Sequence, residues 1–129
     1  FQFRFHYDKG TVRAEINLLK TVLINLIDNA CKASEAGGRI EVGGYRLEEG
    51  YRFEIKDYGV GIPEEEQKNV VKAFYMVDKS RARSKNGAGL GLALCVEILR
   101  LHGSVLKIES QAGEGTCMSF ILPDKEGGK

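Results

Sequence analysis

The chain has 129 residues, 43% of them hydrophobic, which is enough apolar sequence for the core of one ordinary domain. Its 19 basic and 18 acidic side chains leave a formal net charge of +1, so there is no broad basic field that would favour nucleic acid or an anionic membrane as a partner. No apolar run of about eighteen residues predicts a membrane span, and Cys31, Cys95 and Cys117 stand singly, which argues against zinc sites and disulfides and for a soluble domain with reduced thiols.

Hydrophobic periodicity predicts five strands with helices between them. The strands, taken in chain order, are expected near residues 1–7, 38–46, 51–57, 104–110 and 116–122. Apolar residues at helical spacing predict an amphipathic helix over about 14–34, and an almost wholly apolar run predicts a buried helix over about 88–102. The polar stretch between Pro63 and Gly87 predicts a short helix followed by a mobile loop.

The strand at 51–57 alternates between apolar and polar residues, as a strand does when helices cover only one of its faces. We therefore expect an α+β two-layer sandwich, in which about three helices cover one face of a mixed sheet of about five strands.

The first candidate site lies on the predicted helix 14–34. At about 100° per residue, Asn29 lies about 40° from Asn25 and Lys32 about 20° on its other side, so the three form one strip beside the apolar stripe. An amide oxygen can ligate Mg²⁺ without cancelling its charge, and an ammonium one turn further on can meet a phosphate. The alternative is that both Asn side chains border the core and bond to the backbone.

The second candidate is Asp57, which period two places on the apolar side of the strand 51–57. A buried carboxylate is costly unless donors meet it, and the exocyclic amine of adenine with an ordered water would supply them. Gly59 and Gly61 permit the turns and the close approach that a flat base needs, and Ile62 and Pro63 can close one side. The alternative is a plain Asp-x-Gly turn at the end of a strand.

The third candidate is a glycine run, Gly87, Gly89 and Gly91, at the start of the predicted buried helix, where free N–H groups and the helix dipole favour phosphate. A Rossmann site needs a strand just before its glycines, and a Walker loop needs Gly-Lys-Ser or Gly-Lys-Thr, so neither fits. Basic residues precede the glycine run, and two interpretations of them are open: they form a solvated loop, or they fold over a triphosphate. They are Lys79, Arg81, Arg83 and Lys85. Together the three candidates predict a site for ATP.

In this order the motifs resemble those of the catalytic and ATP-binding domain of sensor histidine kinases, within the GHKL superfamily that also holds gyrase, the mismatch-repair ATPases and the large heat-shock chaperone. Residues 25–32 resemble the N box, 57–63 the G1 box, the region of Phe74 the F box and 87–92 the G2 box. The run Gly113-Glu114-Gly115-Thr116 with Phe120 resembles the family's last motif.

The resemblance implies the Bergerat fold, with Asn29 as the ligand of Mg²⁺, Asp57 as the reader of adenine and about 64–88 as the ATP lid. It implies that the motif residues contact the nucleotide; these are Asn25, Asn29, Lys32, Asp57, Gly59, Gly61, Ile62, Phe74, Tyr75, Lys79, Arg81, Arg83, Gly87, Gly89, Leu90, Gly91, Leu92 and Thr116. Because the chain starts without Met inside a predicted strand, we expect residues 1–129 to be one such domain, cut from a longer protein.

One position distinguishes branches of the superfamily. Members that hydrolyse ATP resemble one another in a Glu four residues before the metal-binding Asn, where it activates water, whereas this chain has Asn25 there. An amide cannot take a proton, so we expect little hydrolysis and transfer of the γ-phosphate to another acceptor, with Asn25, Lys32 and Arg81 as the catalytic residues. One departure is Met76, which stands after Tyr75 where many members have Arg.

Neither histidine is the expected phosphoacceptor, because His6 lies in a predicted edge strand and His102 at a helix end, where a cation is favourable. We expect transfer to a histidine on a separate dimerisation domain of a two-component sensor kinase that serves a response regulator. The isolated domain is expected to be monomeric and cytoplasmic, without nucleic acid or membrane insertion, and anchoring of the parent in the inner membrane is left open.

Two alternatives remain for the function. An anti-sigma-type serine protein kinase would share the fold, but the Gly-Leu-Gly-Leu-Ala-Leu stretch at 89–94 favours the histidine branch. A regulatory nucleotide-binding module without phosphotransfer is the second alternative, and Met76 is the one feature that hints at it.

Overall fold

A computed structural model describes residues 2–9, 14–34, 37–67 and 90–123. The strands are β1 (Gln2–Tyr7), β2 (Arg39–Arg46), β3 (Gly50–Asp57), β4 (Lys107–Gln111) and β5 (Gly115–Pro123). The helices are α1 (Ile16–Ala33), α3 (Leu90–Leu101) and the short 3-10 helix η1 (Glu64–Glu66). All five predicted strands and both long helices are confirmed.

The one marked difference in bounds is at β4, which begins at Lys107 and not at 104. The residues before it end α3: Gly103 has a φ of 73°, and the backbone N–H of Ser104 donates to the Leu99 carbonyl at 2.8 Å. A left-handed glycine followed by this bond is a usual way to end a helix, so the strand starts only after the cap is complete.

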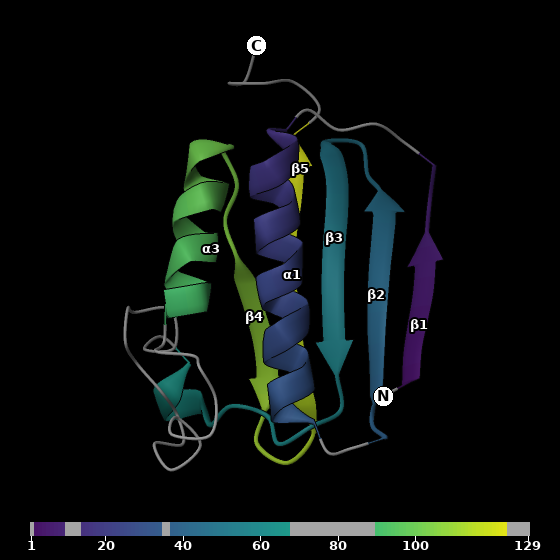
Figure 1. Ribbon diagram of the computed structural model, residues 1–129, viewed down its shortest axis with the longest axis vertical. Coiled ribbons are helices and arrows are strands. Elements are labelled where there is room, and N and C mark those ends of the chain that lie inside the picture. Colours follow the sequence, from purple (N-terminus) through teal and green to yellow (C-terminus); the bar gives the residue numbers. More distant parts are fainter. Residues whose placement is uncertain (1, 10–13, 35–36, 68–89, 124–129) are drawn as a thin grey trace.

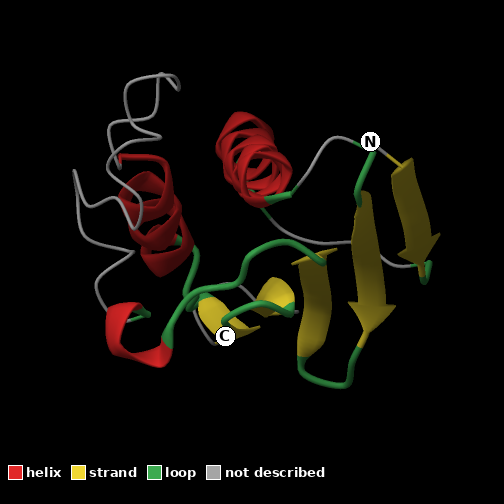
Figure 2. Ribbon diagram, turned by 90° about the horizontal axis from the view of Figure 1, so that it is seen from below, coloured by secondary structure: helices red, strands yellow, loops and turns green. Residues whose placement is uncertain are grey.

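The five strands form one mixed sheet in the order β1-β2-β3-β5-β4. The β1/β2 pair is parallel, and the other three pairs are antiparallel. Both long helices lie on the same face of the sheet (Figure 1), and the view from below shows a layer of helices over a layer of strands (Figure 2). The α+β two-layer fold is therefore as expected. Two long helices are described where about three were expected, and the predicted short helix between Pro63 and Gly87 falls mostly outside the described residues.

The core lies between the two layers. Helix α1 buries Leu19, Val22, Leu26 and Ala30, which recur at the three- and four-residue spacing that predicted the helix. They pack against buried side chains of the sheet and of α3, namely Ile40, Ile55, Leu92, Cys95, Ile98, Leu99, Met118, Phe120 and Leu122. Each large apolar side chain buried in this way contributes about 1.5–3 kcal/mol.

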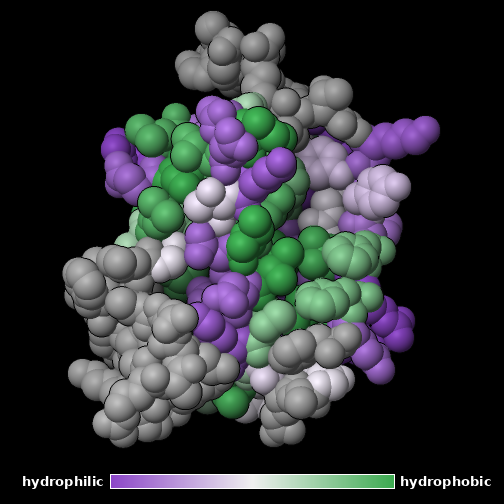
Figure 3. Space-filling view, viewed as in Figure 1, coloured by the Kyte–Doolittle hydropathy of each residue, from purple (hydrophilic) through white to green (hydrophobic). Residues whose placement is uncertain are grey.

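Strand β1 extends the sheet beyond the cover of the helices. Phe3 and Phe5 pair in register with Ile40 and Val42, so they share the helix-bearing face, yet Phe5 is 69% exposed. Figure 3 shows apolar side chains running from α1 toward this edge of the sheet. No helix in the described part of the chain is long and apolar enough to cross a membrane.

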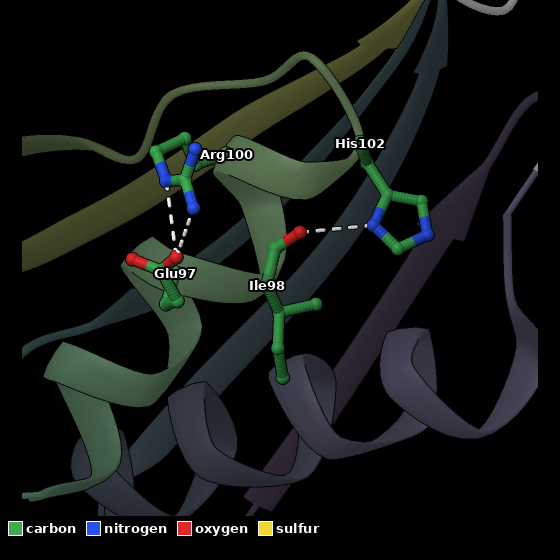
Figure 4. Close-up of polar contacts among 4 residues, drawn as sticks. All are labelled: Glu97, Ile98, Arg100 and His102. Carbon is green, nitrogen blue, oxygen red and sulfur yellow. Dashed lines mark hydrogen bonds and ion pairs between the residues drawn. The ribbon is translucent and has the colours of Figure 1, made fainter.

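The two long helices are joined at the C-terminal end of α3 by His102. Its Nε2 accepts the backbone N–H of Glu15, the N-cap of α1, at 3.1 Å, and its Nδ1 lies 2.9 Å from the Ile98 carbonyl (Figure 4). A ring nitrogen that accepts an N–H carries no proton, so Nδ1–H donates to Ile98 and the imidazole is neutral. The helix-end cation expected for His102 is therefore not its role here, and Figure 4 shows Arg100 paired with Glu97 on the same helix.

Candidate functional site

A row of polar side chains crosses three strands at one end of the core. Asp57 of β3 is directly opposite Thr116 of β5, and Thr116 is directly opposite Ser110 of β4. Residues that are directly opposite share a face of the sheet. This is the face that carries the helices, because Ile55 and Met118, the next pair on the same face, are in the core. Asp57 is 4% exposed and Thr116 5% exposed, so the row replaces apolar residues at the edge of the core.

Asp57 is a buried carboxylate, as its position in the sequence predicted. The backbone N–H of Gly59 donates to its Oδ1 at 2.9 Å, and the backbone N–H of Thr116 is a second donor. Burial raises the pKa of Asp57 above its ordinary value of 3.8, and these two donors lower it in part. A further donor at the carboxylate would stabilise its charged form, which is what the amine of a purine base can provide.

The turn after Asp57 is packed tightly against the rest of the chain. A Cβ built on Gly59 would lie 2.0 Å from the Ala33 carbonyl oxygen at the end of α1. A Cβ built on Gly61, whose φ is 73°, would lie 2.0 Å from the carbonyl oxygen of Gln111 at the end of β4. The close approach predicted for these two glycines is thus made to the protein's own backbone, and their contact with a base stays a prediction.

Ser110 connects this turn to the row. Its Oγ accepts the backbone N–H of Ile62 at 2.8 Å, donates to the Gly115 carbonyl at 2.9 Å, and lies 2.7 Å from the Thr116 Oγ1. Gln67 adds a second link, because its Nε2 donates to the carbonyls of Ile62 at 2.9 Å and Ser110 at 3.0 Å. The sequence predicted neither role, although Ser110 stands two residues after the half-buried Ile108 and so repeats the signal that identified Asp57.

The Asn strip of α1 lies on the side of that helix that faces α3. The Asn25 amide donates to the Thr21 carbonyl at 2.9 Å, and its Oδ1 would be 3.2 Å from a Cβ placed on Gly91 in the first turn of α3. Asn25 thus bonds to the backbone, as the alternative interpretation had it, while its oxygen faces α3. Asn29, half-buried, follows one turn later on the same side.

Lys32 is in a different situation from the one predicted. Its Nζ forms an ion pair with the Asp28 carboxylate at 3.0 Å, one helical turn earlier. The ammonium that was expected to meet a phosphate is therefore already paired, and a phosphate would have to compete with Asp28. This pairing was visible in the sequence as an acid and a base four residues apart on one helix.

The phosphate end of the candidate site is described only in part. Gly91 and Leu92 lie in the first turn of α3, and Leu92 is 9% exposed in the core, so only its backbone is left for a ligand. Leu90 begins the helix. The remaining predicted contacts fall outside the described residues; they are Phe74, Tyr75, Lys79, Arg81, Arg83, Gly87 and Gly89.

The donor set fits a nucleotide better than a metal alone. Within the described ranges no group of three or more His, Cys, Asp or Glu side chains could hold a metal ion. A Mg²⁺ beside Asn29 would therefore take most of its ligands from phosphate and water, which is its usual coordination in nucleotide sites.

Known proteins resemble this chain over almost its whole length. The sequence profile of the family described as Histidine kinase-, DNA gyrase B-, and HSP90-like ATPase matches residues 14–126. The adaptive-response sensory kinase SasA of Thermosynechococcus vestitus is 39% identical over 117 residues, which are 90% of this chain and 30% of SasA. The sensor histidine kinase WalK of Bacillus subtilis is 38% identical over 117 residues, 89% of this chain and 19% of WalK. The chain thus spans less than a third of the length of either relative.

Solved structures agree with the sequence matches. The mycobacterial sensor histidine kinase MprB superposes with a TM-score of 0.82 at 29% identity, over 97% of this chain and 83% of that chain. Full-length ShkA in complex with AMPPNP superposes with a TM-score of 0.82 at 25% identity, over 98% of this chain and 26% of that chain. The likeness includes the elements that carry the candidate site.

Proposed function

Because the chain belongs to the family of histidine kinase-, DNA gyrase B- and HSP90-like ATPases, we propose that it binds Mg-ATP and donates the γ-phosphate to a histidine on a separate dimerisation domain. Its relatives SasA and WalK are named as sensor kinases, and the similar ShkA structure contains AMPPNP, an analogue of ATP. The activity is that of an ATP-dependent protein histidine kinase, of which this chain is the catalytic domain. The parent would be a two-component sensor kinase that serves a response regulator.

The observation that carries the proposal is the buried carboxylate of Asp57. Its two donors are backbone N–H groups, and it is directly opposite Thr116 in a row of polar residues at the edge of the apolar core. A purine with an amine at position 6 places a donor against these acceptors. Asp57 therefore binds the base and fixes its orientation.

The phosphates would lie between α1 and the start of α3. Asn29 would contribute an amide oxygen to Mg²⁺, which when bound neutralises charge on the phosphates. The backbone N–H groups at the start of α3 would bind phosphate oxygens, and Gly91 keeps this turn close to Asn25. Arg81 and the other basic residues at 79–85 would belong to an ATP lid at about 64–88, of which only 64–67 is described.

The proposed reaction is transfer and not hydrolysis. The imidazole nitrogen of the acceptor would form the new bond to phosphorus as the bond to ADP breaks, and the chain's own contribution is to hold the γ-phosphate in line. Relatives that hydrolyse ATP have a Glu at the position of Asn25 in this chain. The Asn25 amide has no basic site with which to activate water. Lys32 would contribute charge only after leaving Asp28.

Calorimetric titration of ATP, with and without Mg²⁺, tests the binding step. We expect metal-assisted binding, a rise in Kd of about tenfold to a hundredfold in Asp57→Asn from the lost charged hydrogen bond, and little phosphate release. Asp8→Asn is the matched control, because Asp8 also accepts a backbone N–H, from Arg46 at 2.9 Å, at the opposite end of the sheet. Equal binding by both variants would contradict the role of Asp57, and rapid phosphate release would contradict the role of Asn25.

The transfer step needs a second experiment. Labelled ATP is mixed with the chain and with a histidine-bearing dimerisation domain from a sensor kinase, and acid-labile phosphate on that histidine is measured. Label on the histidine supports the kinase. Binding without transfer, to any acceptor domain tried, would favour the regulatory module, and label on a serine of a partner protein would favour the serine kinase.

A further inference from the structure

The hydroxyl of Ser110 is the point where the turn after Asp57 meets the last two strands. It has three polar neighbours from two segments, the turn after Asp57 and the start of β5: the Ile62 N–H at 2.8 Å, the Gly115 carbonyl at 2.9 Å and the Thr116 Oγ1 at 2.7 Å. Ile62 is 48 residues away in the sequence, so this contact exists only in the folded chain. A serine hydroxyl has one proton to donate and two lone pairs to accept, and the three neighbours use all of them.

This arrangement fixes the direction of the bond between the two hydroxyls. The proton of Ser110 goes to the Gly115 carbonyl, and one lone pair of Ser110 accepts the Ile62 N–H. The remaining lone pair can only accept, so the Thr116 hydroxyl must be the donor across the 2.7 Å contact. Thr116 is then left with two lone pairs and no proton for any other group.

The consequence is a pair of acceptors side by side. Thr116 is directly opposite Asp57, both are buried on the helix-bearing face, and the carboxylate also has only acceptor capacity when it is charged. A base with a donor at this point satisfies both groups. A base with an oxygen there would meet two acceptors and leave them unpaired in a buried place, which sites of this kind reject strongly.

We propose that Ser110 is a positioning residue that holds the Thr116 hydroxyl as an acceptor and so sets the preference of the site for a 6-amino purine over a 6-oxo purine. The inference rests on the proposed ATP-binding function and adds to it the origin of base selectivity. Ser110 acts through Thr116 and through the Ile62 turn, and not by contact with the nucleotide.

The test compares Ser110→Ala with Ser104→Ala in the full chain. Ser104 is 8% exposed and donates through Oγ to the Ile121 carbonyl at 2.6 Å, near the other end of β5, so it controls for the loss of a buried serine hydroxyl. Dissociation constants for ATP and for inosine triphosphate are measured by calorimetry, and melting temperature is measured for each variant. Inosine triphosphate replaces the 6-amine by an oxygen and keeps the same phosphates.

We expect Ser110→Ala to lower the preference for ATP over inosine triphosphate by about tenfold, because the freed Thr116 hydroxyl can then turn and donate. Ser104→Ala should lower the melting temperature and leave the preference unchanged, and Ser110→Thr, which keeps a hydroxyl, should retain the wild-type preference. A Ser110→Ala variant with wild-type preference, or an equal change in Ser104→Ala, would overturn the inference while ATP binding stands. Failure of the wild-type chain to bind ATP would overturn the proposed function as well.

Discussion

Gly59→Ala is the substitution whose effect on stability follows most directly from the structure. The new Cβ would lie 2.0 Å from the Ala33 carbonyl oxygen, where ordinary contact begins at 3.4 Å. The obstacle is backbone at the end of α1, which cannot rotate away as a flexible side chain can. The turn must therefore move by more than 1 Å, away from the hydrogen bond that the Val60 N–H donates to the same carbonyl at 3.1 Å.

The expected cost is the sum of two effects. Overpacking of this kind costs about 1–3 kcal/mol, and the lost backbone hydrogen bond costs about 0.5–1.5 kcal/mol. We therefore expect the free energy of unfolding to fall by about 1.5–4.5 kcal/mol, which leaves a domain of ordinary stability folded. Because the Gly59 N–H also donates to Asp57, the Kd for ATP should rise in the same variant.

Gly103→Ala is the matched control, since Gly103 has a φ of 73° but no atom within 4 Å of a built Cβ. It bears only the backbone cost of about 1–2 kcal/mol and lies at the opposite end of α3 from Gly91. Urea unfolding gives both free energies, and calorimetry gives both dissociation constants. A Gly59→Ala variant that is no less stable than Gly103→Ala, or that binds ATP as tightly as the wild type, would refute the reasoning.

Three further outcomes are expected. His102→Ala should lower the free energy of unfolding by about 1–2 kcal/mol, because α3 then loses its bond to Glu15, with ATP affinity unchanged; unaltered urea unfolding would contradict this. Burial raises the pKa of Asp57 above 3.8, so its protonation stabilises the folded state below that pH, and this stabilisation is lost as the pH rises through the raised pKa. The free energy of unfolding of Asp57→Asn, measured in urea, should therefore increase relative to that of the wild type from about pH 4 toward pH 7. A difference that stays constant with pH would show that the shift is absent. Burial raises the pKa of Cys95 and Cys117 to about 11 from 9.0, so a disulfide reagent at about pH 8 should label them about a hundredfold more slowly in the folded chain than in urea, and equal rates would refute this.

What could be predicted from the sequence is what local spacing encodes. Asp57 was found because a strand alternates every two residues, and that rule needs no knowledge of neighbouring strands. The apolar stripe of α1 was found for the same reason at the helical period. The ion pair of Lys32 with Asp28 is equally local, and it was missed although the sequence displays it.

What could not be predicted depends on contacts between distant segments. Gly59 and Gly61 were predicted to allow close approach of a base, which stays a prediction; the atoms that exclude a side chain there, on Ala33 and Gln111, are brought near only by the packed fold. Ser110 likewise gains its role from Ile62 and Thr116, and no spacing rule relates the first of these to it. Sequence patterns therefore locate buried polar residues and tight turns better than they locate the contacts that hold them in place.

The chemistry of the site depends on the register of β5 as much as on the residues that it carries. Asp57 faces the Thr116 hydroxyl because the two are directly opposite, and a slip of one residue would present Cys117 and turn the hydroxyl to the open face of the sheet. This register requires glycine at position 115, since its φ is 110° and a Cβ there would lie 2.2 Å from the Asp57 carbonyl oxygen. Gly115, one of the glycines that resemble a family motif, thus acts here through strand pairing: it brings the backbone of β5 close to β3, so that a carboxylate and a hydroxyl lie opposite each other on one face of the sheet.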